Sequence, residues 1–136
     1  MGYLTVISET GLVPHSACMF QVGPPGSRAW RGFHPVVHHR FRGQGEVDRS
    51  SQDGLINHYI RFEVADSLLT SAMAMIDSKY GEAIYSLGVR DCVSMSADVA
   101  RVCRLVVPTV NMTPYGLIQL LRVNKYTHLD VRPYPW

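Results

Sequence analysis

Alternation of hydrophobic and polar residues predicts strands in the first third of the chain. The run 3–8 is rich in β-branched residues and half-alternating, which is typical of a strand. In the run 15–22, successive side chains fall on two opposite faces, and His15 stands at its start. The stiff turn 23–26, Gly-Pro-Pro-Gly, then leads into 28–33. The runs 15–22 and 28–33 therefore predict a hairpin.

Farther along the chain the pattern predicts one more strand and two helices. The run 58–64 alternates clearly and predicts a strand. Asp66 is a suitable N-cap for a helix that ends near Tyr80 and Gly81. Thr113 followed by Pro114 marks the start of the last helix. The tail 129–136 is expected to be a short strand or an extended arm.

Between residues 35 and 57 the regular pattern disappears. This segment is polar and glycine-rich, and it contains the pair His38 and His39. Loops of this length inside a compact domain are usually functional or mobile. We therefore expect a polar loop that forms a rim or a lid.

The stretch from Tyr85 to Val107 predicts a helix with a cysteine on its first turn. Gly88 loosens the chain, Asp91 is a good N-cap, and apolar residues follow Cys92 at helical spacing. Unpaired backbone N–H groups at a helix start favour a thiolate, so we expect a pKa below the usual ~8.5 for Cys92. The same N–H groups can hold an oxyanion.

Composition limits the classes of function. The chain has 136 residues, of which 46% are hydrophobic, so we expect a single globular domain over 1–136. A net charge of +2, without a basic run interleaved with aromatics, argues against nucleic acid. Neither a membrane-spanning run nor a signal peptide is apparent, so we expect a soluble chain without membrane insertion.

The cysteine pattern excludes two common uses of the thiol. Cys18, Cys92 and Cys103 make an odd count without Cys-x-x-Cys spacing. Neither a disulfide framework nor a zinc site is predicted, and we expect no cofactor. Cys18 and Cys103 are interpreted as core residues, because free Cys behaves as a small hydrophobe.

Cys92 and His15 are the candidate nucleophile and base. A histidine at a strand start can project over a neighbouring helix end, accept the thiol proton and return it to a leaving group. A structural role for each residue is the alternative: a turn histidine after Pro14, and a cysteine that only starts a helix. The histidines His34, His38 and His39 suggest a metal cluster as a third interpretation. We do not favour it, because adjacent residues point apart on an extended chain.

The order of these motifs resembles the permuted papain-like cysteine hydrolases, which include NlpC-type amidases and lecithin retinol acyltransferase-like proteins. In order, the matching features are Pro14-His-Ser-Ala17, the Gly-Pro-Pro-Gly hairpin, Trp30–Pro35, Gly43–Val47, the strand 58–64, a helix, and Tyr85 seven residues before Cys92. In such permuted members the histidine-bearing sheet precedes the cysteine-bearing helix, as it does here.

The resemblance implies an α+β fold of the circularly permuted papain-like type. It implies a small antiparallel sheet packed on about three helices, with the nucleophile Cys92 at a helix N-terminus and facing the His15 strand. The family's third residue corresponds to His34, with Gln21 or Ser27 as alternatives. Tyr85 corresponds to a tyrosine that helps to hold the oxyanion or the substrate carbonyl. Packing alone is an equal explanation for Tyr85.

The resemblance also implies a reaction and a biological setting. The reaction is cleavage of an amide bond through a thioester, in a protein or in a peptidoglycan stem peptide. Small domains of this kind are often toxins that a larger protein delivers into a target bacterial cell, in its cytoplasm or its periplasm, and a cognate immunity protein blocks them. The alternatives are an acyltransferase of the lecithin retinol type, which the polar 35–57 segment disfavours, and a binding module without catalysis.

Overall fold

The computed structural model describes residues 1–11, 13–37, 40–50, 53–108 and 113–129. Over these ranges seven strands form an antiparallel sheet in the order β6-β4-β3-β2-β1-β5-β7. The strands are β1 (Gly2–Glu9), β2 (His15–Gln21), β3 (Ala29–Pro35), β4 (Arg42–Asp48), β5 (Ile56–Val64), β6 (Ile84–Ser86) and β7 (His128–Leu129). The helices are α1 (Asp66–Tyr80), α2 (Cys92–Val102), α3 (Pro114–Leu121) and a short 3-10 turn, η1 (Asp53–Leu55).

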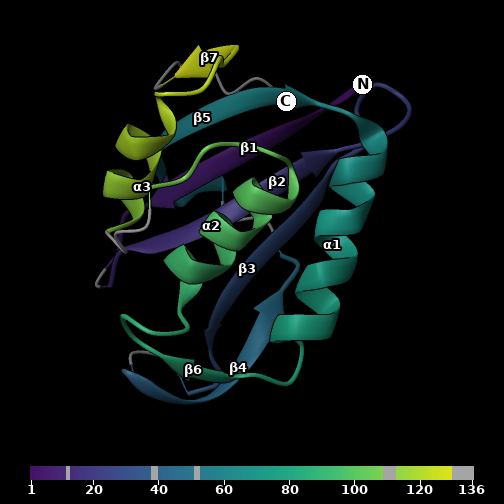
Figure 1. Cartoon of the computed structure of the whole chain (residues 1–136). Coiled ribbons are helices and arrows are strands. Elements are labelled where there is room, and N and C mark those ends of the chain that lie inside the picture. The colour runs from purple at the N-terminus through teal and green to yellow at the C-terminus, as the bar shows by residue number, and fades with distance from the viewer. Residues whose placement is uncertain (12, 38–39, 51–52, 109–112, 130–136) are drawn as a thin grey trace.

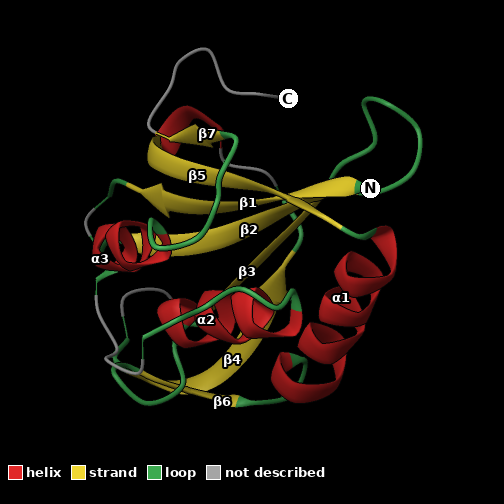
Figure 2. Ribbon diagram, turned by 45° about the horizontal axis from the view of Figure 1, so that its top comes forward, coloured by secondary structure: helices red, strands yellow, loops and turns green. Residues whose placement is uncertain are grey.

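All three α-helices lie on the same face of the sheet (Figures 1 and 2). Apolar side chains from these helices and from that sheet face make the main core, for example Leu69, Val99 and Leu117 against Phe20 and Phe62. The predicted α+β class, with an antiparallel sheet packed on three helices, is confirmed. In the part of the chain that the structure describes, no helix is long and apolar enough to cross a membrane.

The alternation of β2 decides what each face of the sheet holds. Cys18 and Phe20 are buried in the helix-covered core, whereas Ala17 and Met19 belong to a second cluster on the other face. That second cluster also contains Ile7, Trp30, Ile56 and Tyr59. Because successive side chains of a strand point to opposite faces, His15 shares the face of Ala17, and Ser16 shares the face of Cys18.

The helix starts follow ordinary capping chemistry, with one correction. Thr113 accepts a hydrogen bond from the Gly116 N–H at 3.0 Å, and Pro114 occupies the first helical position, as predicted. Asp66, predicted as an N-cap, is instead the first residue of α1, and Ala65 is the N-cap. A carboxylate in the first turn still interacts favourably with the helix dipole.

The prediction of an irregular polar loop from 35 to 57 is wrong. This segment contains β4 and the turn η1, and β4 pairs with β3 and with β6, the latter also absent from the prediction. Gly43 and Gly45 lie within β4 and remove the apolar alternation that reveals a strand. His38 and His39 lie outside the described residues. The tail forms β7 only at residues 128–129, and 130–136 also lie outside them.

Gly45 provides a test of how β4 sits beside β3. A Cβ added at Gly45 would lie 2.4 Å from Phe33 Cε1 and 2.8 Å from the carbonyl oxygen of Ala83. We expect Gly45→Ala to lower the free energy of unfolding by about 1–3 kcal/mol, because the clash involves a buried ring and backbone. Gly54→Ala is the matched control, since nothing lies within 4 Å of its added Cβ. Thermal or urea unfolding of both variants measures the difference, and equal stability would contradict the packing.

Candidate active site

Cys92 is the first residue of α2, as the sequence predicts. The preceding residue, Asp91, is the N-cap: one carboxylate oxygen accepts the Ser94 N–H at 2.9 Å, and the other accepts the Gly88 N–H at 2.7 Å. Gly88 has a φ of 81°, a left-handed conformation that glycine adopts without strain. Asp91 therefore fastens the preceding loop to the helix, and this fixes where Cys92 stands.

The start of α2 lies where β2 and β3 separate. These strands pair over Ala17–Phe20 and Ala29–Gly32, after which β3 continues along β4 as far as Pro35. Ser16 is thus unpaired on the β3 side, and α2 fills this position. The Ser16 hydroxyl donates to the Ser96 hydroxyl at 2.8 Å, and the Ser16 backbone N–H hydrogen-bonds to the Cys92 thiol. The thiol therefore lies at the peptide that joins Ser16 to His15.

His15 and His34 come together at the same end of the sheet. Their ring centroids are 6.2 Å apart at an interplanar angle of 65°. Extending the β2–β3 register by two residues would place them opposite each other. Gly32 makes room for the His15 imidazole, since an added Cβ there would lie 2.8 Å from His15 Nε2. This juxtaposition agrees with the expectation that His34 stands beside the candidate base.

The side chains of His15 and Cys92 make their contacts on opposite faces of the sheet. Ser16 points toward α2, so His15, one residue earlier, points to the other face and rests over Gly32. The described hydrogen bonds include none between the Cys92 thiol and the His15 imidazole. The thiol and the imidazole therefore lie on opposite sides of the peptide that joins His15 to Ser16, where β2 and β3 separate. For a direct proton transfer, the imidazole must turn into the gap between these two strands.

Acidic side chains complete this end of the sheet. Glu9 is directly opposite His15 in the β1–β2 register and is only 2% exposed. One of its oxygens, Oε1, has no hydrogen-bond partner among the described residues. His34 Nε2 lies 3.5 Å from Glu46 Oε1 and 3.7 Å from Asp48 Oδ2. A row of ionisable groups, Glu9, His15, His34 and Glu46, therefore crosses four adjacent strands.

Burial sets the protonation states of the two candidate catalytic groups. Burial raises the pKa of the Cys92 thiol to about 12, although backbone N–H groups of Ser16, Val93 and Cys92 favour the thiolate. The prediction of a lowered Cys92 pKa is therefore wrong for this conformation: the helix N–H groups act in the expected direction, but desolvation outweighs them. Burial and the neighbouring His34 lower the pKa of His15 to about 4. At neutral pH the structure thus holds a thiol and a neutral imidazole.

Tyr85 is both a core residue and a neighbour of the thiol. Its ring lies 5.5 Å from the ring of Phe33, centroid to centroid, in the main core. Burial raises the pKa of its hydroxyl, and the charges of Cys92 and Asp91 raise it further. The phenol is therefore protonated at neutral pH. A protonated phenol is a hydrogen-bond donor, which an oxyanion requires.

The alternatives to His34 lie elsewhere. Gln21 ends β2 and pairs with Tyr3, six residues from His15 and so roughly 20 Å away along the strand. Ser27 lies in the turn that follows, where its N–H donates to the Pro24 carbonyl. Neither residue can orient His15. The described residues contain no group of three His, Cys, Asp or Glu side chains placed to hold an ion, and His38 and His39 of the metal interpretation lie outside them.

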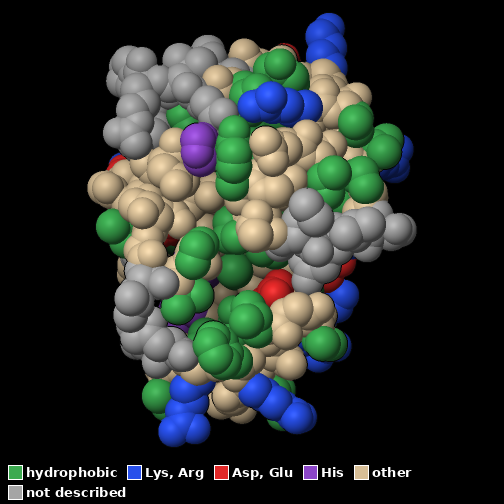
Figure 3. All heavy atoms as spheres, turned by 90° about the vertical axis from the view of Figure 1, so that its left-hand side faces the viewer, with side chains coloured by type: hydrophobic (Ala, Val, Ile, Leu, Met, Phe, Trp, Pro, Cys, Tyr) green, Lys and Arg blue, Asp and Glu red, His purple; other side chains and the backbone are tan. Residues whose placement is uncertain are grey.

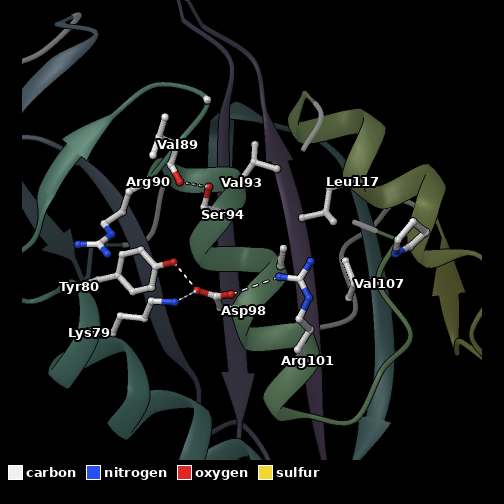
Figure 4. A pocket seen from close by; sticks show the side chains of 13 residues that line it. Lys79, Tyr80, Val89, Arg90, Val93, Ser94, Asp98, Arg101, Val107 and Leu117 are labelled. Carbon is white, nitrogen blue, oxygen red and sulfur yellow. Dashed lines mark hydrogen bonds and ion pairs between the residues drawn. The ribbon is translucent and has the colours of Figure 1, made fainter. Parts of the chain in front are cut away.

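A pocket of about 280 Å³ lies on the side of α2 that faces away from the sheet (Figure 4). At its centre Asp98 accepts hydrogen bonds from Lys79 at 2.6 Å and from Tyr80 at 2.5 Å, and pairs with Arg101 at 3.2 Å. Burial raises the pKa of Asp98, but the hydrogen bonds from Lys79 and Tyr80 and the charges of Lys79 and Arg101 lower it by more. The pKa of Asp98 is therefore below its ordinary value. This cluster ties α1 to α2 and so supports the helix that carries Cys92.

His58, Cys18 and Cys103 have structural roles. His58 stacks on Tyr115 of α3, with centroids 3.8 Å apart, and so packs β5 against a helix. Cys18 and Cys103 are buried free thiols, which confirms their interpretation as core residues.

Comparison of the chain with protein-family models, with curated proteins and with solved structures finds no match. The site is therefore interpreted from its own geometry.

Sequence reasoning missed Glu9 and Asp48. Glu9 follows the predicted run 3–8 directly and is the only acidic residue of β1, and an acid at the end of an apolar strand is a signal of a special environment. Its position opposite His15 follows only from the register of β1 with β2. Asp48 falls in the segment that the sequence predicts to be a loop. Its position opposite Gly32 in the β3–β4 pairing was therefore not predicted.

Glu9 gives the site a characteristic pH dependence of stability. Burial, then the charges of Asp48 and Asp53, raise the Glu9 pKa from 4.5 to about 7. The folded state therefore binds this proton more tightly than the unfolded chain, and stability falls as pH rises from about 4.5 to about 7.

Glu9→Gln removes this loss of stability, because the amide resembles the protonated acid. We expect the variant to unfold like wild type near pH 4.5 and to be more stable at pH 8, by up to about 3 kcal/mol. Thermal unfolding across this range is the measurement, and a difference independent of pH would contradict the assignment.

Proposed function

We propose that the protein is a cysteine hydrolase of the permuted papain-like type that cleaves an amide bond through a thioester. The observation that carries the proposal is the position of the Cys92 thiol: the first residue of a helix, at the separation of β2 and β3, one peptide from His15. His34 beside His15, and Tyr85 beside Cys92, support it.

The proposed chemistry begins from the neutral pair. His15 is a neutral imidazole at any pH above about 4, so once it turns into the separation of β2 and β3 it can accept the thiol proton as Cys92 attacks the carbonyl carbon. The backbone N–H groups at the start of α2 and the Tyr85 hydroxyl then stabilise the oxyanion. His15 returns the proton to the leaving amine, and water hydrolyses the thioester that remains on Cys92. In this scheme His34 positions His15.

The proposed biological setting is a bacterial toxin domain, delivered into a target cell, whose substrate is a protein or a peptidoglycan peptide and which a cognate immunity protein blocks. This setting rests on the resemblance of the motif order alone, which is an associational argument. A non-catalytic binding module is the competing interpretation.

Acyl transfer of the lecithin retinol type is a second candidate that one observation favours. The segment 36–41, expected to be polar, exposes Val36, Val37 and Phe41. An acyltransferase uses the same thioester but passes the acyl group to an acceptor other than water. An exposed apolar surface on the domain suits a lipid acyl donor.

Alanine variants of the candidate dyad test catalysis directly. Cys92→Ala and His15→Ala are each expected to abolish growth inhibition when the chain is expressed in the bacterial cytoplasm or exported to the periplasm. Cys103→Ala is the matched control, because Cys103 is also a buried free thiol, at the other end of the same helix. Equal toxicity of wild type and both dyad variants would contradict a catalytic role and favour the binding module.

Gly32 allows a finer test of where His15 must lie. Gly32→Ala places a Cβ 2.8 Å from His15 Nε2, and the imidazole can move away at little cost in stability. We expect hydrolytic activity or toxicity to fall about tenfold or more, since the imidazole loses the place beside His34 from which it turns toward Cys92, and displacement of a general base by about 1 Å is costly. Unfolding measurements on the same protein should show a nearly unchanged midpoint. Full activity in Gly32→Ala would indicate that His15 acts from a different position or not at all.

A further inference from the structure

Six exposed hydrophobic side chains lie on two neighbouring segments of the chain. We call them the apolar rim: Val36, Val37, Phe41, Ile84, Leu87 and Val89. Each is between 46% and 79% exposed. Figure 3 shows hydrophobic side chains gathered on the lower part of one face of the molecule, with Lys and Arg side chains below them. Exposed apolar groups that are clustered rather than scattered indicate a binding surface.

Backbone hydrogen bonds hold the two segments of the apolar rim side by side. The Leu87 N–H donates to the Phe41 carbonyl at 2.8 Å. The Val36 N–H donates to the Gln44 carbonyl at 2.7 Å, and Gln44 is paired with Ile84. The rim is thus one structural unit, formed where β3 turns into β4 and where β6 leads into α2.

Positive charge predominates around the apolar rim, although Glu82 is exposed two residues before Ile84. The segments 36–42 and 84–90 contain Arg40, Arg42 and Arg90 and no acidic residue. All three arginines are exposed, and none takes part in an ion pair among the described residues. Apolar side chains next to unpaired arginines fit a surface that has anionic groups above an apolar layer.

The apolar rim is close in sequence to two residues of the candidate site. Val36 follows His34 by two residues, and Val89 precedes Cys92 by three. A surface that contacts the rim would therefore lie near the segments that lead into His34 and Cys92.

We propose that the apolar rim docks on an anionic phospholipid surface and presents the Cys92 site to molecules at that surface. The rim side chains enter the boundary between headgroups and acyl chains, and Arg40, Arg42 and Arg90 contact lipid phosphates. The contact is peripheral and uses loops rather than a spanning helix. This inference goes beyond the proposed hydrolase, because docking does not depend on the chemistry of Cys92.

Co-sedimentation of the full chain with lipid vesicles tests the proposal. Vesicles of phosphatidylcholine mixed with phosphatidylglycerol are compared with vesicles of phosphatidylcholine alone, at low and at high salt. We expect binding to the anionic vesicles at low salt, and weaker binding at high salt and to pure phosphatidylcholine. Phe41→Ser should reduce the partition coefficient about tenfold, and Arg42→Gln about fivefold.

Matched controls separate the apolar rim from the rest of the surface. Val123→Ser removes an equally exposed apolar side chain after α3, and Lys125→Gln removes a positive charge near it. Neither should change the partition coefficient by more than about twofold. Cys92→Ala should bind vesicles like wild type, so a failure of catalysis and a failure of docking are distinguishable.

Two results would overturn the proposal. One is the absence of binding to anionic vesicles, which would leave a protein partner as the occupant of the rim. The other is an equal loss of binding in the rim variants and in the control variants.

Discussion

The arrangement of the site depends on one packing constraint: the start of α2 occupies the place where β2 and β3 separate. The Ser16–Ser96 hydrogen bond and the Ser16 N–H directed at the thiol hold the helix there. Asp91 caps the helix and also binds the loop that precedes it, so the position of Cys92 relative to the sheet is fixed. On the other face, the same separation leaves His15 beside His34 and over the bare Cα of Gly32.

The protonation states follow from burial at this place. Desolvation favours the neutral form of each group, which gives a thiol at Cys92, an imidazole at His15 and a protonated Glu9 over part of the physiological range. A neutral pair can transfer its proton only as a new charge forms on a substrate, where oriented N–H groups stabilise it. In the resting site the thiol is protonated, so its reactivity depends on His15 accepting the proton.

Local sequence signals predicted much of the fold. The alternation of β2, the Gly-Pro-Pro-Gly turn, the Asp91 and Thr113 caps and the position of Cys92 depend on neighbours within a few residues. β4 was missed because its glycines carry no side-chain pattern, although Gly45 is required by the Phe33 ring packed against it. The Cys92 pKa was wrong because the depth of a thiol beneath a sheet depends on tertiary packing. Glu9 and the apolar rim were missed for the same reason: strand register brings their partners from distant segments.

The most direct test of the central claim, that His15 acts on Cys92, is the rate of thiol alkylation by iodoacetamide at neutral pH. Mass spectrometry of peptides would follow Cys92 in wild type and in His15→Ala, with Cys18 and Cys103 in the same molecules as internal references. The account predicts that loss of His15 slows alkylation of Cys92 about tenfold or more, while the two reference thiols are unchanged. The same rate for Cys92 in both proteins would contradict it and leave Cys92 as a structural residue at the start of α2.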